Sequence, residues 1–128
     1  MNLEHIAYNV HDPLAMARWY VDHLDMKIVM QRETPNPVAF IADQRGMMIE
    51  IYRNPTVPLL DNRAILPLTM HLAFYCDDMV GQRARLMAAG ATAEGEITGS
   101  AGETQVAMLR DPWGLVVQLI RRPEPLRA

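Results

Sequence analysis

Two stretches of the chain share one unusual pattern: DQRGMMIEIYR at residues 43–53 and DPWGLVVQLIRR at residues 111–122. Each runs from Asp through two variable residues to Gly, then through three apolar residues, one polar residue and two apolar or aromatic residues to Arg. The polar residue is Glu50 in the first stretch and Gln118 in the second. A polar side chain inside an apolar strand needs a partner, so its repetition indicates a shared role.

The repetition extends upstream of these stretches. EHIAYNVHD at residues 4–12 aligns with MHLAFYCDD at residues 70–78, so that His5 corresponds to His71. The two alignments have nearly the same offset, 66 residues upstream and 68 residues downstream. Two matches in the same order indicate an internal duplication. We therefore expect two modules, at residues 1–53 and 68–122. A Pro-containing linker at residues 54–67 joins them, and a tail follows at residues 123–128.

Each module carries the same predicted order of elements, a strand, a helix and three strands. In the first copy the strands are expected at about 3–10, 27–33, 38–42 and 47–53, with a helix from Asp12-Pro13 to about Leu24. In the second copy a helix capped by Asp77 or Asp78 ends at Gly90, and strands follow at about 91–97, 104–110 and 115–121. The Asp-x-x-Gly tetrads form the tight turns before the last strands. The predicted fold class is α+β, with two tandem βαβββ modules.

The alternation of strand side chains predicts which residues share a face. In the first module Ile6, Tyr8 and Val10 are expected beneath the helix, on the face opposite to His5. The helix-free faces form the predicted substrate pocket. In addition to His5, Glu50, His71 and Gln118, these faces carry Ala7, Asn9, Met48, Tyr52, Ala73, Tyr75, Val116 and Ile120.

Each module thus offers one imidazole and one Glu or Gln on the same face. A buried carboxylate without a partner is costly, and a divalent cation removes that cost. Neutral imidazole, carboxylate and amide oxygen are all ligands of first-row metals. The other histidines, His11 and His23, lie after a strand and near a helix end and fit ordinary surface positions.

The motifs LEHIAYNVHD, WYVDHLDMKIV, MIEIYR, MHLAFYCDD and DPWGLVVQL resemble the glyoxalase I, bleomycin-resistance and extradiol-dioxygenase family, the vicinal oxygen chelate superfamily. The resemblance covers essentially the whole chain. It implies a curved mixed sheet around a cavity with four metal-ligand positions, onto which His5, Glu50, His71 and Gln118 fall. Gln118 stands where a glyoxalase I-like site commonly has a carboxylate, and Asp25 stands where the family has Gly.

This resemblance implies a metal-dependent lyase or isomerase that acts on a small substrate chelated through adjacent oxygens. The cofactor would be a divalent ion: nickel, zinc, cobalt, manganese or iron. Glu50 is the best base on offer, because the amide of Gln118 does not titrate in the useful range. An extradiol-type iron(II) dioxygenase using His5, His71 and Glu50 is a second interpretation. A bleomycin-resistance-like binding module without enzymatic activity is the third.

Composition limits the partners that the chain can have. The formal charge of −3 and the scattered basic residues give no reason to expect nucleic acid, and no apolar run is long enough for a bilayer. With Cys76 alone there is no internal disulfide, which fits a cytoplasmic protein. We expect a small-molecule substrate and a homodimer, since family sites are often shared between chains. Arg32 and Glu33, at the rim of the variable segment QRETPNPV (residues 31–38), could meet a polar substrate. A solvated strand end is the commoner role of such residues.

Overall fold

The computed structural model describes residues 1–126, which divide into two compact units, Met1–Leu60 and a second unit that begins at Asp61. The first contains β1 (His5–Asn9), α1 (Pro13–His23), β2 (Lys27–Arg32), β3 (Val38–Ala42) and β4 (Met48–Tyr52). The second contains η1 (Asn62–Ala64), β5 (Leu72–Tyr75), α2 (Met79–Ala88), β6 (Thr92–Thr98), β7 (Gln105–Arg110) and β8 (Val116–Arg121). The α+β class and the βαβββ order of both modules are confirmed. The end of the predicted tail, residues 127–128, lies outside the described residues.

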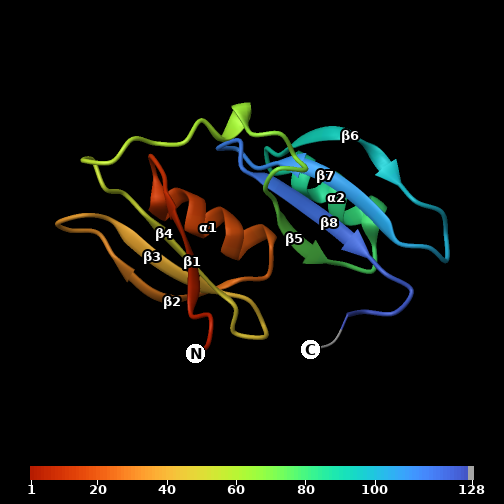
Figure 1. The fold of residues 1–128 in the computed structure, drawn as a ribbon, viewed down its shortest axis with the longest axis horizontal. Coiled ribbons are helices and arrows are strands. Elements are labelled where there is room, and N and C mark those ends of the chain that lie inside the picture. Colours follow the sequence, from red (N-terminus) through yellow and green to blue (C-terminus); the bar gives the residue numbers. More distant parts are fainter. Residues whose placement is uncertain (127–128) are drawn as a thin grey trace. The chain divides into compact units, whose positions relative to one another are not determined.

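The strands form one four-stranded mixed sheet in each unit, with the orders β1-β4-β3-β2 and β5-β8-β7-β6 (Figure 1). In both sheets the first and last strands of the module are parallel neighbours, and the other pairs are antiparallel. The first and last strands of each module therefore lie side by side. A short 3-10 helix, η1, lies in the segment that was expected to be a linker.

The two units also have the same strand register. Ala7 faces Glu50 across the β1–β4 pair, and Ala73 faces Gln118 across the β5–β8 pair. On the other side of the last strand, Phe40 faces Glu50 and Met108 faces Gln118. Each partner is related to its counterpart by the same offset as in the sequence alignment. The duplication is thus structural, and it puts Glu50 and Gln118 in equivalent positions.

Aspartate side chains begin both helices. The Asp12 carboxylate accepts a hydrogen bond from the Ala15 backbone N–H at 3.1 Å, and Pro13 occupies the first turn, where its missing N–H costs nothing. In the second unit Asp78, rather than Asp77, caps α2 and accepts from the Gly81 N–H at 2.8 Å. These caps fix where each helix starts after its first strand.

Each helix covers one face of its own sheet. α1 packs against β2, β3 and β4, while α2 packs against β6, β7 and β8 (Figure 1). The fully buried side chains at these contacts include Met16, Tyr20, Ile41, Ile51, Leu86 and Leu109. Of the predicted helix-side residues, Tyr8 on β1 and Val10 directly after it are buried, but Ile6 remains 39% exposed. Ile6 lies near the start of an edge strand, where only the neighbour β4 flanks it.

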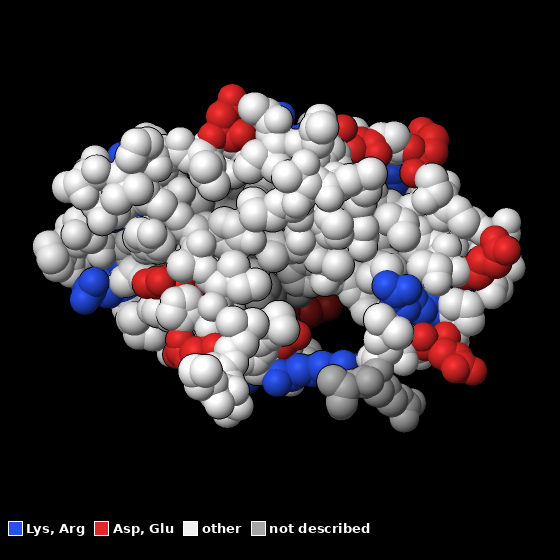
Figure 2. Space-filling view, in the orientation of Figure 1, with Lys and Arg blue, Asp and Glu red and all other residues white. Residues whose placement is uncertain are grey.

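Charged side chains are dispersed over the face drawn in Figure 2, where Lys and Arg alternate with Asp and Glu in small groups. That face shows none of the broad basic surface that nucleic-acid binding requires. Among the described residues, no helix has both the length and the apolar character needed to cross a membrane.

Candidate metal centre

The first half of the predicted site lies on the helix-free face of the β1-β4-β3-β2 sheet. His5 faces Met48 across the parallel pair, and Glu50 is two residues further along β4, so the two side chains are diagonal neighbours. Nε2 of His5 lies 3.3 Å from Oε2 of Glu50. Both side chains are partly exposed, at 32% and 24% respectively, so a ligand can reach them.

A divalent ion fits this pair. Two atoms that each lie about 2.1 Å from one ion are roughly 3.0–3.4 Å apart when they are adjacent ligands in octahedral or tetrahedral geometry. The observed separation falls in this range. In the neutral tautomer that carries its proton on Nδ1, Nε2 and the carboxylate oxygen would face each other as two lone pairs, an arrangement that requires a proton or a cation. The chemistry of the two donors therefore suits a metal.

The other ring nitrogen of His5 contacts Glu4, whose carboxylate accepts a hydrogen bond from Nδ1. This hydrogen bond raises the pKa of His5, against partial desolvation, and the charges of Glu4 and Glu50 add to the rise. The edge of the imidazole also meets the Phe40 ring, with the ring centroids 5.3 Å apart. A carboxylate on Nδ1 and an aromatic wall are the usual means of orienting a metal-binding histidine.

The second half of the site lies in the other unit. His71 precedes β5 by one residue, and its Nδ1 lies 2.9 Å from the Pro67 carbonyl oxygen. A carbonyl only accepts hydrogen bonds, so Nδ1 carries the proton and Nε2 keeps its lone pair. His71 is thus held in the tautomer that binds metal through Nε2, as His5 is by Glu4.

Gln118 is the buried member of the set, with only 8% of the residue exposed. Its amide nitrogen donates to the sulfur of Met108, its neighbour across the β7–β8 pair, at 3.6 Å. Among the described residues the structure gives its amide oxygen no hydrogen-bond donor. The oxygen is therefore left as a free acceptor, which is what a metal ligand requires.

Neither unit by itself holds a complete site. Among the described residues, no three His, Cys, Asp or Glu side chains cluster tightly enough to hold a metal ion. The first unit supplies the His5–Glu50 pair, and the second supplies His71 and the amide of Gln118.

The predicted pocket residues of the first unit have different surroundings. A cavity of about 230 Å³ opens beside one candidate ligand, Glu50, which lines it together with Tyr52. Asn9 instead anchors the chain after β4, accepting from the Asn54 N–H at 2.8 Å and donating to the Asn54 and Val57 carbonyls at 3.2 Å. Ala7 is exposed and Met48 half-buried.

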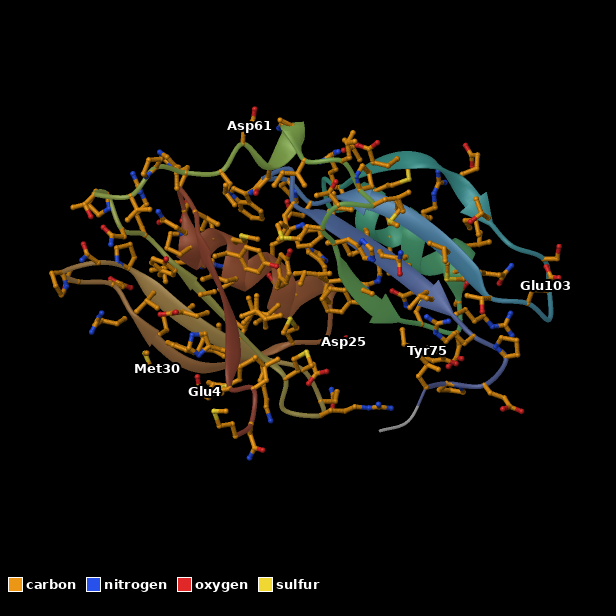
Figure 3. All side chains as sticks on the ribbon, viewed as in Figure 1. Glu4, Asp25, Met30, Asp61, Tyr75 and Glu103 are labelled. Atoms are coloured by element: carbon orange, nitrogen blue, oxygen red, sulfur yellow. The ribbon has the colours of Figure 1, made fainter. Side chains whose placement is uncertain are left out.

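In the second unit the predicted pocket residues range from buried to exposed. Val116 is buried, Ile120 is half-buried and Ala73 is exposed. Tyr75, at the end of β5 (Figure 3), donates its hydroxyl to Asp77 at 2.9 Å, and this hydrogen bond raises the pKa of Tyr75. The tyrosine hydroxyl is therefore already paired.

The larger cavity of the second unit, about 450 Å³, lies beside the start of α2 and is lined by Asp77, Asp78, Met79, Val80, Ile97, Gly99, Gln105 and Arg121. None of the predicted ligands or pocket residues is among them. The smaller cavity in the first unit is the better candidate site because Glu50 lines it. The predicted pocket did not include Met30, Asn36 and Phe40, which line this cavity together with Glu50. The strand registers put Met30 and Phe40 level with Glu50.

Comparison with solved structures supports the fold. A glyoxalase family protein from Bacillus cereus superposes with a TM-score of 0.79 at 16% identity, covering 94% of this chain and 93% of that chain. Glyoxalase I from Zea mays gives 0.76 at 23% identity, covering 96% of this chain but only 45% of the maize protein. TnmS3, an antibiotic binding protein from Streptomyces sp. CB03234, gives 0.69 at 18% identity, covering 95% and 96%.

These likenesses establish the fold, and proteins that share it include both an enzyme and a binding protein. A search of proteins with curated function finds no match. The family model for the Glyoxalase/Bleomycin resistance protein/Dioxygenase superfamily matches residues 2–119, nearly the whole chain. The chain belongs to the glyoxalase/bleomycin resistance protein/dioxygenase superfamily.

Proposed function

We propose that the protein is a metal-dependent lyase or isomerase that acts on a small substrate with two adjacent oxygens. His5, Glu50, His71 and Gln118 would hold one divalent ion, and Glu50 would move a proton. The observation that carries the proposal is the His5–Glu50 pair, whose donor atoms lie 3.3 Å apart beside a cavity. The equivalent register of Gln118 supports a second pair of ligands in the duplicated unit.

The four side chains would have different roles because their chemistry differs. The two imidazoles, whose Nε2 lone pairs would be engaged by the ion, and the amide are neutral ligands, so Glu50 is the only charged ligand and the one with a second oxygen left to take a substrate proton. Glu50 also lines the cavity, where a substrate proton beside a carbonyl can come within its reach. A bound divalent ion would supply positive charge for the substrate oxygens.

Glu50→Gln tests this role because the amide keeps the size of the side chain and removes the base. In the metal-loaded protein, we expect the substitution to lower kcat by about 10²- to 10⁴-fold. The screen for that reaction starts with thiol adducts of 2-oxoaldehydes and with acyl thioesters. The matched control is Glu124→Gln, at an exposed position after β8 and outside both cavities, which should leave kcat unchanged. An active Glu50→Gln protein would remove Glu50 as the base.

The converse substitution tests the second half of the site. Gln118→Glu adds a second carboxylate at the position where Gln118 lies opposite Met108. We expect tighter metal binding, because an anionic ligand replaces a neutral one. Unchanged metal affinity would show that this position does not contact the ion.

The identity of the metal separates the alternatives within the family. Bound iron together with turnover of catechols and oxygen uptake would favour the extradiol-type dioxygenase. Failure to bind any divalent ion, with binding of a small ligand retained, would favour a binding module, the class to which TnmS3 belongs by name.

We also propose a cytoplasmic homodimer. The dimer is supported by the apolar surface of the edge strands of the first unit, where Ile6 on β1 and Ile28, Val29 and Met30 on β2 are each at least 39% exposed. The single cysteine, Cys76, is what supports the cytoplasm. Exposed apolar residues on edge strands favour pairing with another chain. Sedimentation equilibrium should give twice the chain mass, and a monomer at all concentrations would contradict the proposal.

A further inference from the structure

The cavity of the first unit has a cationic end as well as the carboxylate of Glu50. Its lining includes Arg32, at the end of β2, and Arg53, directly after β4. Arg53 donates to the Asn54 carbonyl at 2.7 Å. Among residues 1–126, no hydrogen bond or ion pair holds the guanidinium of Arg32, which is exposed. An arginine without a protein partner at a cavity is available to a ligand.

The strand registers place Arg32 relative to Glu50. One row across the sheet contains Glu50, Phe40 and Met30, and the next row on the same face contains Tyr52, Val38 and Arg32. Figure 3 marks Met30 on the edge strand β2, and Arg32 is two residues further along that strand. Arg32 is thus two strands and one row from Glu50, or about 12 Å between Cα atoms from ideal sheet spacings. If the Arg32 side chain extends towards Glu50, the space left between the guanidinium and the carboxylate is about the length of a small molecule.

The charges of the lining favour an anion. Two arginines and one glutamate line the cavity, so its net charge is positive even before Glu50 is paired with a cation. A guanidinium presents parallel N–H donors that match the two oxygens of a carboxylate or phosphoryl group. The apolar side chains Met30, Val38 and Phe40 separate the two ends, and they suit a short hydrocarbon segment between two polar groups.

We propose that Arg32 binds an anionic group of the substrate, a carboxylate or a phosphoryl group, at the end of the cavity opposite Glu50. The substrate is then a small acid whose adjacent oxygens lie a few bonds from its anionic group. This inference rests on the proposed function for the position of those oxygens. The anion subsite itself depends only on Arg32 and its cavity.

The anion subsite can be tested on the metal-free protein. Acetate, methylphosphonate and the neutral control acetamide are titrated while NMR follows the Arg32 Nε–H signal and the Phe40 amide. We expect saturable shifts with the two anions and none with acetamide, and the tighter of the two anions identifies the class. The shift of the Phe40 amide should disappear in Arg32→Gln, and both shifts should persist in Arg45→Gln, a control at an exposed turn position outside the cavity.

The link to the metal is tested with two chelating probes of equal length. Butyrohydroxamate and succinic monohydroxamate both chelate through adjacent oxygens, but only the second has a terminal carboxylate. In the metal-loaded protein, calorimetry should give about tenfold or tighter binding of the succinic probe. Arg32→Gln should abolish that preference without changing the affinity for butyrohydroxamate.

The outcomes separate the two claims. No anion-dependent shift at Arg32, or a preference for the succinic probe that survives in Arg32→Gln, would overturn the anion subsite. Anion shifts at Arg32 in a protein that binds no divalent ion would overturn the metal-dependent reaction and leave the anion subsite supported.

Discussion

Asp25 adopts a left-handed backbone conformation, with φ of 54°, in the turn between α1 and β2. The resemblance to the family already indicated glycine at this position, and the structure supplies the reason. A side chain at positive φ brings Cβ close to the backbone, which costs about 1–2 kcal/mol, and Asp is among the residues that tolerate it best. With Asp25 in place of glycine, the chain keeps the left-handed turn at the cost of part of this strain.

Asp25→Gly should therefore stabilise the protein. We expect the free energy of unfolding in urea to rise by about 0.5 kcal/mol, because relief of strain exceeds the extra flexibility of glycine in the unfolded chain. The same substitution at Asp22, exposed inside α1, should lower it by roughly 0.3–0.5 kcal/mol. A loss of stability in both variants would contradict the account of the turn.

His5 predicts how metal binding depends on pH. The hydrogen bond and charge of Glu4 raise the pKa of His5 above its ordinary value of 6.5, so the ring holds its proton more firmly. A metal ligand must be unprotonated, so metal affinity should fall as pH drops, with a midpoint above pH 6.5. Glu4→Gln should move that midpoint to lower pH, as followed by the cobalt dissociation constant at each pH. A midpoint that stays in place or rises would contradict this role of Glu4.

At the scale of elements, the two Asp-x-x-Gly turns have the same hydrogen bonds and different surroundings. Asp43 accepts from the N–H groups of Arg45 and Met47, and Asp111 accepts from those of Trp113 and Leu115, at 2.8–2.9 Å in every case. These bonds explain why aspartate opens both turns. The glycines, Gly46 and Gly114, have φ of 89° and 87°.

The different surroundings of Gly46 and Gly114 predict that the two turns tolerate an alanine to different degrees. A Cβ at Gly46 would meet nothing within 4 Å, whereas a Cβ at Gly114 would lie 2.5 Å from Cγ of Arg63. Gly46→Ala should cost about 1–2 kcal/mol from the backbone alone. Gly114→Ala should cost roughly 1–3 kcal/mol more, because Arg63 must move. Chemical denaturation of the two variants measures the difference, and equal losses would show that Arg63 does not crowd this turn.

The elements themselves could be predicted from the sequence because their signals are local. The alternation of apolar residues, the Asp caps and the Asp-x-x-Gly turns located both helices and every strand except β5 to within a few residues. The strand β5 was expected only from the alignment of its segment with residues 4–12. The duplication also identified Glu50 and Gln118 as equivalents, and the strand registers agree with that equivalence. Whether these residues bind metal remains a prediction.

Contacts between distant segments could not be predicted in this way. Arg110 is buried, pairs with Glu94 and donates to the carbonyl oxygens of Asn62, Ile65 and Gly114, thereby holding the segment around η1 to the sheet. Nothing in the local pattern around this arginine distinguishes it from a surface residue. For Arg32 the sequence indicated a strand end that could meet a polar substrate, but its position at the cavity follows only from its register with Val38, two strands from Glu50.

At the scale of the whole molecule, duplication explains why the candidate ligands come in two pairs. Each unit repeats a histidine at the start of its first strand and a Glu or Gln in its last strand, and each histidine has its Nδ1 held by a neighbouring acceptor. Within residues 1–126, neither unit brings together three His, Cys, Asp or Glu side chains that could hold a metal ion. One ion held by all four proposed ligands would therefore need residues from both units, of one chain or of two.

The most direct test of this requirement is the metal content of the purified protein after reconstitution with divalent ions, measured by mass spectrometry. We predict about one ion per chain in the wild type. His5→Ala and His71→Ala should each bind far less, since each removes one ligand from a different unit. His11→Ala, at an exposed histidine after β1, should bind as much as the wild type. No bound ion in the wild type, or equal metal content in all four proteins, would contradict the account.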